Sequence, residues 1–201
     1  MRIGIIGAGT MGATLAALLT QIGHQVAIAN SRGPRTLTGV AAQTGAAPVR
    51  ITEVTRNADV VIAAIPEKSI PGLPAGLLSS LPADTVVIDT GNYVPKLRDG
   101  HIDAIDAGLP ESQWVQSQLG HPVVKAFNTI RPASLANLGK PAGAVGRAVI
   151  PGRSRRPGRQ IRRAGTREPA GLRGPGTDPP LDAAPQALAD TTPEQTASWR
   201  C

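Results

Sequence analysis

The sequence opens with an apolar run that leads directly into a glycine pattern, and this junction constrains the fold more than any other part of the chain. Residues 3–12 read Ile-Gly-Ile-Ile-Gly-Ala-Gly-Thr-Met-Gly, so the pattern Gly-x-Gly-x-x-Gly lies between a strand-like segment and a helix-like segment at 10–22. There the first glycine permits a tight turn, the second lets the backbone approach a pyrophosphate, and the third lets the helix pack close to the strand. The free N–H groups and the positive end of the helix dipole would face the phosphates. The junction predicts a dinucleotide-binding turn made of six residues: Gly7, Ala8, Gly9, Thr10, Met11 and Gly12.

The residues after the second predicted strand, at 25–29, indicate which dinucleotide the chain prefers. A site that prefers NAD has Asp or Glu at this point, because a carboxylate accepts hydrogen bonds from the ribose 2′-OH. This chain instead has an amide, a hydroxyl and two guanidinium groups, from Asn30, Ser31, Arg32 and Arg35. Arg32 can bind a 2′-phosphate through two hydrogen bonds, and Ser31 can donate another. The four residues predict NADP(H), with a solvated basic loop as the alternative, above all for Arg35.

Strand-like and helix-like segments alternate up to about residue 146, which predicts an α/β fold with a Rossmann-type, doubly wound parallel sheet. Further strands are expected at 47–51, 59–65, 85–89 and 122–127, and helices at 34–44, from Thr52, and at 112–119. The strand at 59–65 is apolar after its first residue, as buried parallel strands are. Its carboxyl end should flank the nicotinamide end of a cofactor, with Lys68 and Ile70 close enough in sequence to line that rim. A loop role without ligand contact is the equal alternative for those two residues.

The composition changes near residue 147. Residues 147–201 contain 10 Arg, no Lys and 5 acidic residues, and so hold +5 of the total formal charge of +7. Their prolines and glycines do not suit helix interiors or central strands, so we predict an NADP-binding domain at 1–146 followed by a disordered tail. An excess of Arg, Pro and Gly without Lys is also what an out-of-frame GC-rich gene would encode. A frameshift after about residue 148 is therefore a further hypothesis, which the coding DNA tests.

Composition also limits the partners. No stretch approaches the ~20 apolar residues of a membrane span, and the three histidines lack metal-ligand spacing, so we expect neither a membrane nor a metal site. The single cysteine, Cys201, fits a reducing compartment, and we expect a cytoplasmic protein. The arginine-rich tail lacks the interleaved aromatic side chains that stack on bases, so nucleic acid is not an expected partner.

Five separated blocks of sequence, matched in order within residues 1–146, resemble the NADPH-dependent coenzyme F420 reductase family and its dinucleotide-binding relatives. The blocks are Gly4 to Gly12, Ala29 to Pro34, Ala63 to Pro66, Ile88 to Tyr93 and Val123 to Thr129. The resemblance implies hydride transfer between NADP(H) and a small-molecule redox partner, either coenzyme F420, which is a deazaflavin, or a flavin-like compound.

The resemblance also implies which residues form the site. It assigns the glycine pattern to the pyrophosphate and the loop after the second strand to the 2′-phosphate. Ala64, Ile65 and Pro66 would contact the nicotinamide side, and Asn128 would lie near the second redox partner. Lys125 is a candidate for assisting catalysis, although a lysine on a strand is more often structural. Because the two rings carry the chemistry, little acid–base machinery is needed, which fits the lack of an obvious catalytic His–carboxylate pair.

Other functions stay open at this point. After residue 146 the chain departs from the family's pattern, in which a further strand and helix complete the pocket for the second cofactor. The main alternative is therefore an NADP-binding module without turnover. A reductase of the pyrroline-carboxylate type shares the N-terminal fold, but it needs a helical dimerisation domain for which this sequence has no pattern. The oligomeric state is open, and a homodimer is among the candidates.

Overall fold

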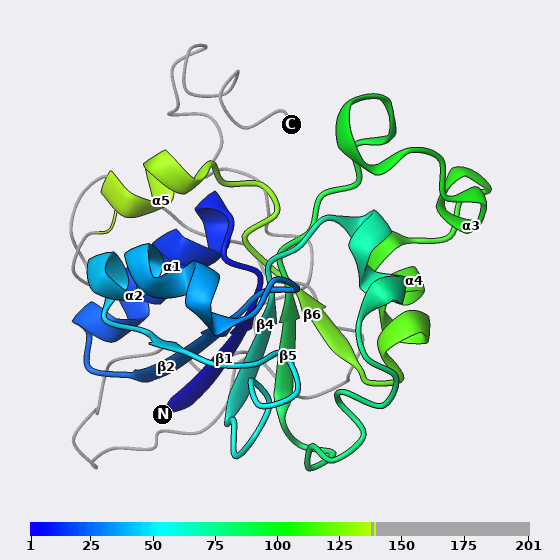
Figure 1. Cartoon of the computed structure of the whole chain (residues 1–201). Helices are drawn as coiled ribbons and strands as arrows, with labels where there is room; N and C mark the ends of the chain where they lie inside the picture. Colours follow the sequence, from blue (N-terminus) through cyan, green and yellow to red (C-terminus); the bar gives the residue numbers. More distant parts are fainter. Residues whose placement is uncertain (138, 140–201) are drawn as a thin grey trace, which may run out of the picture. The chain divides into compact units, whose positions relative to one another are not determined.

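The computed structural model describes residues 1–137 and 139 (Figure 1). The predicted tail at 147–201, with its disorder and frameshift hypotheses, lies outside these described residues. In chain order the elements are β1 (Arg2–Ile6), α1 (Thr10–Gln21), β2 (Gln25–Ala29), the 3₁₀ helix η1 (Pro34–Leu37), α2 (Thr38–Thr44), β3 (Ala47–Pro48), β4 (Val60–Ala63), the 3₁₀ helix η2 (Glu67–Gly72), β5 (Val86–Asp89), the π-helix η3 (Pro95–Asp99), α3 (Asp103–Asp106), α4 (Glu111–Leu119), β6 (Val123–Lys125) and α5 (Pro132–Asn137). Among the described residues, no helix has the length and apolar character needed to cross a membrane.

The six strands form one parallel sheet in the order β3-β2-β1-β4-β5-β6. The register places Ile5 of β1 opposite Ile28 of β2 on one side and Ile62 of β4 on the other. From β1 the chain adds β2 and β3 on one side of the sheet, and then β4, β5 and β6 on the other side. This order confirms the doubly wound Rossmann-type sheet. Because all strands are parallel, their carboxyl ends lie at one edge, where the loops after β1, β2, β4, β5 and β6 meet.

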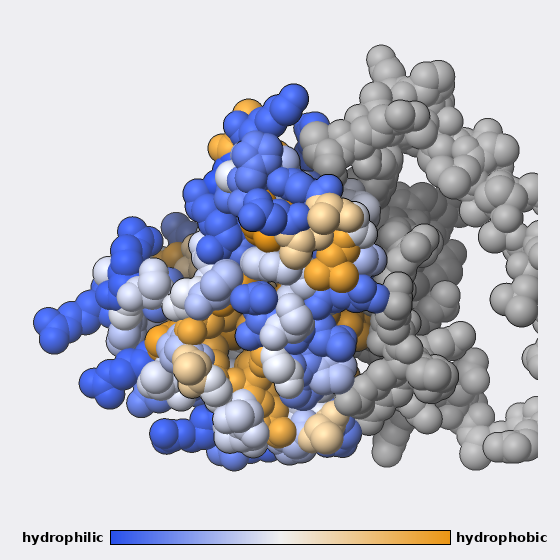
Figure 2. All heavy atoms as spheres, turned by 90° about the vertical axis from the view of Figure 1, so that its right-hand side faces the viewer, coloured by the Kyte–Doolittle hydropathy of each residue, from blue (hydrophilic) through white to orange (hydrophobic). Residues whose placement is uncertain are grey.

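Helices cover both faces of the sheet. Figure 1 shows α1, α2 and α5 on one face and α4 on the other, and α1 contacts both α2 and α5. Seen from the side that carries α3 and α4, the surface is largely hydrophilic, with apolar side chains grouped between the polar ones (Figure 2).

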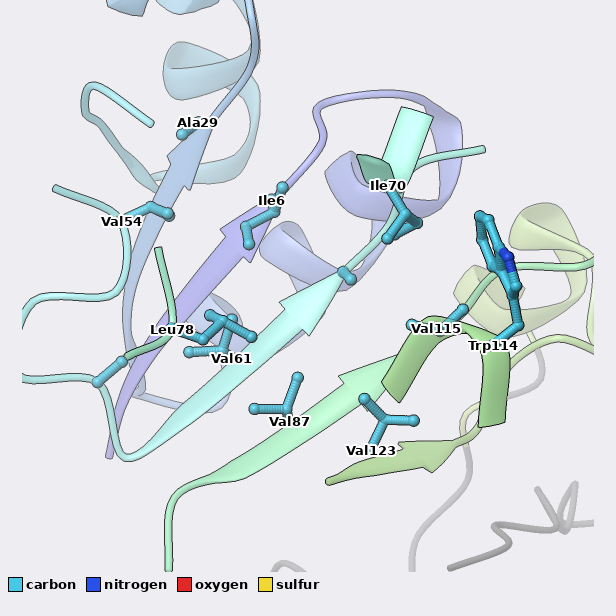
Figure 3. Packing of buried hydrophobic residues seen from close by; sticks show 12 residues of the cluster. Ile6, Ala29, Val54, Val61, Ile70, Leu78, Val87, Trp114, Val115 and Val123 are labelled. Carbon is cyan, nitrogen blue, oxygen red and sulfur yellow. The ribbon is translucent and has the colours of Figure 1, made fainter. Parts of the chain in front are cut away.

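Alternate side chains of the strands build a separate core on each face. On one face, Ile5 and Ile28 pack with Leu15 of α1. On the other face, Val61 and Val87 belong to a cluster with Trp114 and Val115 of α4 (Figure 3). Strands that bury side chains on both faces read as continuous apolar runs, which is why β1 and β4 could be recognised in the sequence.

The segment between β3 and β4 differs from the prediction. The strand expected at 47–51 ends at Pro48, and residues 51–57, where a helix from Thr52 is expected, form successive turns. A Cβ on Gly4 would lie 2.1 Å from the carbonyl oxygen of Val54, so this carbonyl packs directly onto β1. In a helix the same carbonyl would point along the helix axis to an N–H four residues later. The contact with β1 therefore requires turns, and the helix prediction is wrong.

Several other elements are shorter or additional. The helix predicted at 34–44 is divided into η1 and α2, and the strands predicted at 59–65 and 122–127 shorten to β4 and β6. The elements η2, η3, α3 and α5 have four to six residues each, too few for a helical period to be visible in the sequence. Ile70, expected near the rim of the site, is buried in the core beside Trp114 instead.

Candidate functional site

Close backbone contacts fold the glycine turn between β1 and α1. Gly7 has a φ of +107°, and its N–H donates to the carbonyl of Ala29 over 2.8 Å. A Cβ on Gly12 would lie 2.0 Å from the carbonyl oxygen of Gly7. Only glycine at position 12 therefore lets the first turn of α1 approach β1 this closely. The turn is joined to the end of β2 through Ala29.

Gly9 differs from the other two glycines because the protein's own packing does not require it. Its backbone is extended, with φ −72° and ψ −176°, and a Cβ there would meet no atom of the described residues within 4 Å. Gly9 also lacks a side-chain cap for α1, so the first N–H groups of that helix stay available. This open, exposed backbone at a helix N-terminus fits a pyrophosphate.

Asn30 shapes the loop after β2. Its Oδ1 accepts the backbone N–H of Arg32 over 3.0 Å, and its Nδ2 donates to the Thr36 hydroxyl over 2.9 Å. That hydroxyl in turn donates to the carbonyl of Gly33 over 2.8 Å. Three exposed side chains that the sequence predicts for a 2′-phosphate follow β2: Ser31 and Arg32 in this loop, and Arg35 in η1. Thr36, which helps to hold the loop, was not among the predicted site residues.

The segment after β4 meets the glycine turn. A Cβ on Gly7 would lie 2.3 Å from the carbonyl oxygen of Ala64 and 2.7 Å from Cγ2 of Ile65. The Ala64 N–H donates to the carbonyl of Ile6 over 2.7 Å, and Pro66 leads directly into η2. The structure thus brings the predicted pyrophosphate turn and the predicted nicotinamide-side segment, residues 64–66, into contact.

The predicted catalytic residues lie at or after the end of β6, two strands away from β4 in the sheet. Asn128 is half-buried and follows Phe127, whose φ of +67° is unusual for a bulky side chain. Such conformations cluster at functional sites, so the outlier supports a functional hypothesis for this loop. The catalytic roles of Asn128 and Lys125 stay predictions.

The ammonium group of Lys125 is bound by three carboxylates. Its Nζ lies 2.8 Å from an oxygen of each of Glu67, Asp89 and Glu111. Glu67 and Asp89 are fully buried, and the Lys125 side chain is 11% exposed. Two of the three N–H donors of the ammonium are hydrogen-bonded to Glu67 and Asp89, and Glu111 makes an ion pair with the same group. We call these four residues the buried ion cluster; it joins the carboxyl ends of β5 and β6 to the starts of η2 and α4.

Three carboxylates around one ammonium leave an excess of negative charge. Burial raises the pKa of Glu67 to about 7, repulsion from Asp89 adds to the rise, and Lys125 opposes it. Burial alone would lower the pKa of Lys125, but Asp89 and Glu67 outweigh it and hold that pKa above its ordinary value. Lys125 therefore keeps its charge, while Glu67 titrates near neutral pH.

The sequence did not predict Glu67, Asp89 and Glu111 as site residues, although one signal was present. Asp89 and Lys125 each end an apolar strand, and the carboxyl ends of parallel strands share one edge. Glu67 directly follows Pro66, which ends the segment after β4. That pattern could have indicated an ion pair at this edge, but not its burial.

A His–carboxylate pair lies in the segment between β5 and α4, where the sequence made none obvious. Nδ1 of His101 is 2.9 Å from Oδ2 of Asp106, and the Tyr93 hydroxyl donates to Oδ1 of Asp106 over 2.9 Å. The same hydroxyl accepts the N–H of Ile102 over 2.8 Å. The hydrogen bonds from His101 and Tyr93 lower the pKa of Asp106. The His101 side chain is 80% exposed, and these contacts hold the surface segment around α3 in place.

The sheet order, the glycine turn under α1 and the adjoining ends of β2 and β4 define a Rossmann-type dinucleotide-binding domain. Residues 2–93 match the family model described as NADP oxidoreductase, coenzyme F420-dependent. The chain belongs to this family of NADP-dependent oxidoreductases. The resemblance found in the sequence is thereby confirmed.

Solved structures of other proteins show the same fold. A hypothetical protein, SMa0349 from Sinorhizobium meliloti, is 32% identical with a TM-score of 0.58, over 70% of this chain and 67% of that one. A candidate F420-dependent NADP reductase from Arthrobacter sp. FB24 is 21% identical with a TM-score of 0.54, over 71% of this chain and 69% of that one. Glycerol-3-phosphate dehydrogenase from Coxiella burnetii is 15% identical with a TM-score of 0.51, over 67% of this chain and 43% of that one, and shows the fold alone. No curated protein matches the chain.

Proposed function

We propose that the chain binds NADP(H) at the carboxyl edge of the sheet and transfers a hydride between its nicotinamide ring and coenzyme F420 or a flavin-like partner. The loop after β2 carries this proposal. It has no carboxylate for a 2′-OH, and Asn30 uses both polar atoms of its side chain within the loop. Ser31 and Arg32 are thereby left exposed next to each other, a donor pair that suits a phosphate.

The residues present fit the cofactor. The backbone at Gly9 and the first N–H groups of α1 would hold the pyrophosphate, because a Cβ position open to 4 Å leaves room for it. Arg32 and Ser31 would hold the 2′-phosphate, and Ala64 to Pro66 would position the nicotinamide ring. When bound, NADPH supplies the hydride, so the protein's task is to align the two rings and exclude water. We assign to Asn128 the orientation of the second redox partner.

Replacing Arg32 with alanine tests the choice of cofactor. We expect the Kd for NADP⁺ to rise about 10- to 100-fold, because a charge-assisted hydrogen-bond pair is worth roughly 1.5–3 kcal/mol. The Kd for NAD⁺, which has no 2′-phosphate, should change little. Arg56→Ala is the matched control: it removes one exposed positive charge before β4, at the opposite edge of the sheet, and should affect neither ligand. Equal losses for NADP⁺ and NAD⁺ in the Arg32 variant would contradict the assigned role.

Turnover is tested by mixing the protein with NADPH and F420 and following the F420 absorbance. Bleaching supports the proposed reaction. Tight binding of NADP⁺ without reduction of F420 or of any flavin would favour the alternative, an NADP-binding module without turnover. The homodimer and the cytoplasmic location stay predictions.

A further inference from the structure

Glu67 connects the buried ion cluster to the segment proposed to hold the nicotinamide ring. Its Oε1 accepts a hydrogen bond from Nζ of Lys125 over 2.8 Å. Along the chain, Glu67 directly follows Pro66, and Ala64 and Ile65 contact the glycine turn. Only two residues therefore lie between Glu67, which pairs with Lys125, and Ala64, whose carbonyl contacts Gly7.

The packing around Glu67 leaves its carboxyl group little freedom. A Cβ on Gly91 would lie 2.4 Å from Oε1 of Glu67 and 3.0 Å from Oδ1 of Asp89, so the backbone after β5 presses directly on both carboxylates. Oε2 of Glu67 is buried and has no hydrogen-bond partner within the part of the chain that the structure describes. A buried carboxylate with one unpaired oxygen is costly to keep ionised. The strength of the ion pair between Glu67 and Lys125 therefore depends on whether Glu67 is protonated.

The charged groups that face Glu67 come from three elements. They are Lys125 of β6, Asp89 of β5 and Glu111 of α4. Asp99 of η3, which is also buried, has partners of its own outside the buried ion cluster. It pairs with Arg98 and accepts the backbone N–H of Lys68 over 3.5 Å. Among the residues that the structure describes, Lys125 is the one cation in direct contact with Glu67, and it is shared with two other carboxylates. The balance of charge therefore depends on whether Glu67 holds a proton.

We propose that Glu67 is a protonation-sensitive positioning residue for the cofactor site, which fixes residues 64–66 through its ion pair with Lys125 so that NADP(H) affinity follows its charge. This inference rests on the proposed function, because it concerns the same site. The ionised carboxylate makes a charge-assisted hydrogen bond that anchors the segment, and the neutral acid anchors it less firmly. The rise of the pKa of Glu67 to about 7 places the change within the physiological range. Affinity should therefore be higher above that pH than below it.

The test compares the Kd for NADP⁺ between about pH 6 and pH 8 in the wild type and in Glu67→Gln, which fixes the neutral state. The 2′-phosphate of the ligand titrates in this range as well, but it contributes equally to both proteins and cancels in their ratio. We expect the Kd of Glu67→Gln divided by the Kd of the wild type to rise about fivefold or more as the pH rises, with a midpoint near pH 7. Glu53→Gln, which neutralises a carboxylate in the turns between β3 and β4, outside the buried ion cluster, should give a flat ratio.

The outcomes separate the two proposals. If both proteins bind NADP⁺ and the ratio of their Kd values does not change with pH, this inference alone is overturned. A folded wild type that does not bind NADP⁺ at any pH overturns the proposed function and this inference with it. If Glu67→Gln does not fold, the wild type is measured with NAD⁺, which has no 2′-phosphate. Its affinity should still rise through neutral pH and should rise less in Glu67→Asp, whereas a flat wild-type profile overturns the inference.

Discussion

Replacing Lys125 with methionine is expected to lower the free energy of unfolding by about 3–5 kcal/mol at pH 7, because breaking a buried ion pair leaves an uncompensated charge. Glu67 and Asp89 are fully buried, and Lys125 is the cation that lies 2.8 Å from both. Urea unfolding followed by tryptophan fluorescence measures the change, because Trp114 of α4 is buried in the hydrophobic core.

Two comparisons make this result specific. Arg50→Met removes an exposed pair with Glu53 at 3.8 Å and should cost less than about 1 kcal/mol. At about pH 5 the loss in Lys125→Met should shrink, because Glu67 can then enter the core as a neutral acid. A loss no larger than that of Arg50→Met, and unchanged with pH, would show that the buried ion cluster does not stabilise the fold.

Gly12→Ala should destabilise the protein, whereas Gly9→Ala should weaken cofactor binding only. A Cβ at position 12 would lie 2.0 Å from the carbonyl of Gly7, so backbone must move, at a cost of about 1–3 kcal/mol or more. A Cβ at position 9 meets no described atom within 4 Å, so stability should stay within about 0.5 kcal/mol. The same methyl group would occupy the space proposed for the pyrophosphate, and we expect the Kd for NADP⁺ to rise about tenfold or more.

Gly39→Ala is the matched control, since Gly39 lies in α2 with nothing within 4 Å of its Cβ position. It should be neutral or slightly stabilising, because alanine is favoured over glycine in helices. Thermal unfolding and titration with NADP⁺ are measured for all three variants. Unchanged affinity in Gly9→Ala would contradict the placement of the pyrophosphate at this turn, and unchanged stability in Gly12→Ala would contradict the close packing of α1 on β1.

Local patterns predicted the parts of the fold that depend on neighbouring residues. The junction of β1, the glycine turn and α1 could be recognised because each glycine serves a nearby backbone contact. The turns at 51–57 could not, because they depend on the contact of Val54 with Gly4, fifty residues earlier in the chain. A propensity for helix from Thr52 was overridden by this tertiary contact.

The candidate site shows the same division. Residues 30–36 form one short segment, the loop after β2 and the start of η1, so its phosphate-binding character was visible in the sequence. The hydrogen bond from Asn30 to Thr36 was not. The buried ion cluster joins Lys125 to Glu67, 58 positions away, and to Asp89, 36 positions away. Opposite charges at such separations become partners only through the order of strands in the sheet. The sequence could therefore suggest Lys125 as a functional residue and an ion pair where the strands end, but not the burial of the carboxylates that bind it.

The most direct test of the central claim is a thermal-shift titration of the purified protein with NADP⁺ and, separately, with NAD⁺. A ligand at about 100 times its Kd adds roughly 2.7 kcal/mol to the stability of a protein that binds it only when folded. We expect NADP⁺ to raise the unfolding temperature by several degrees, and NAD⁺ at the same concentration to raise it far less. A cooperative unfolding transition that neither ligand shifts would contradict the assignment of an NADP(H) site.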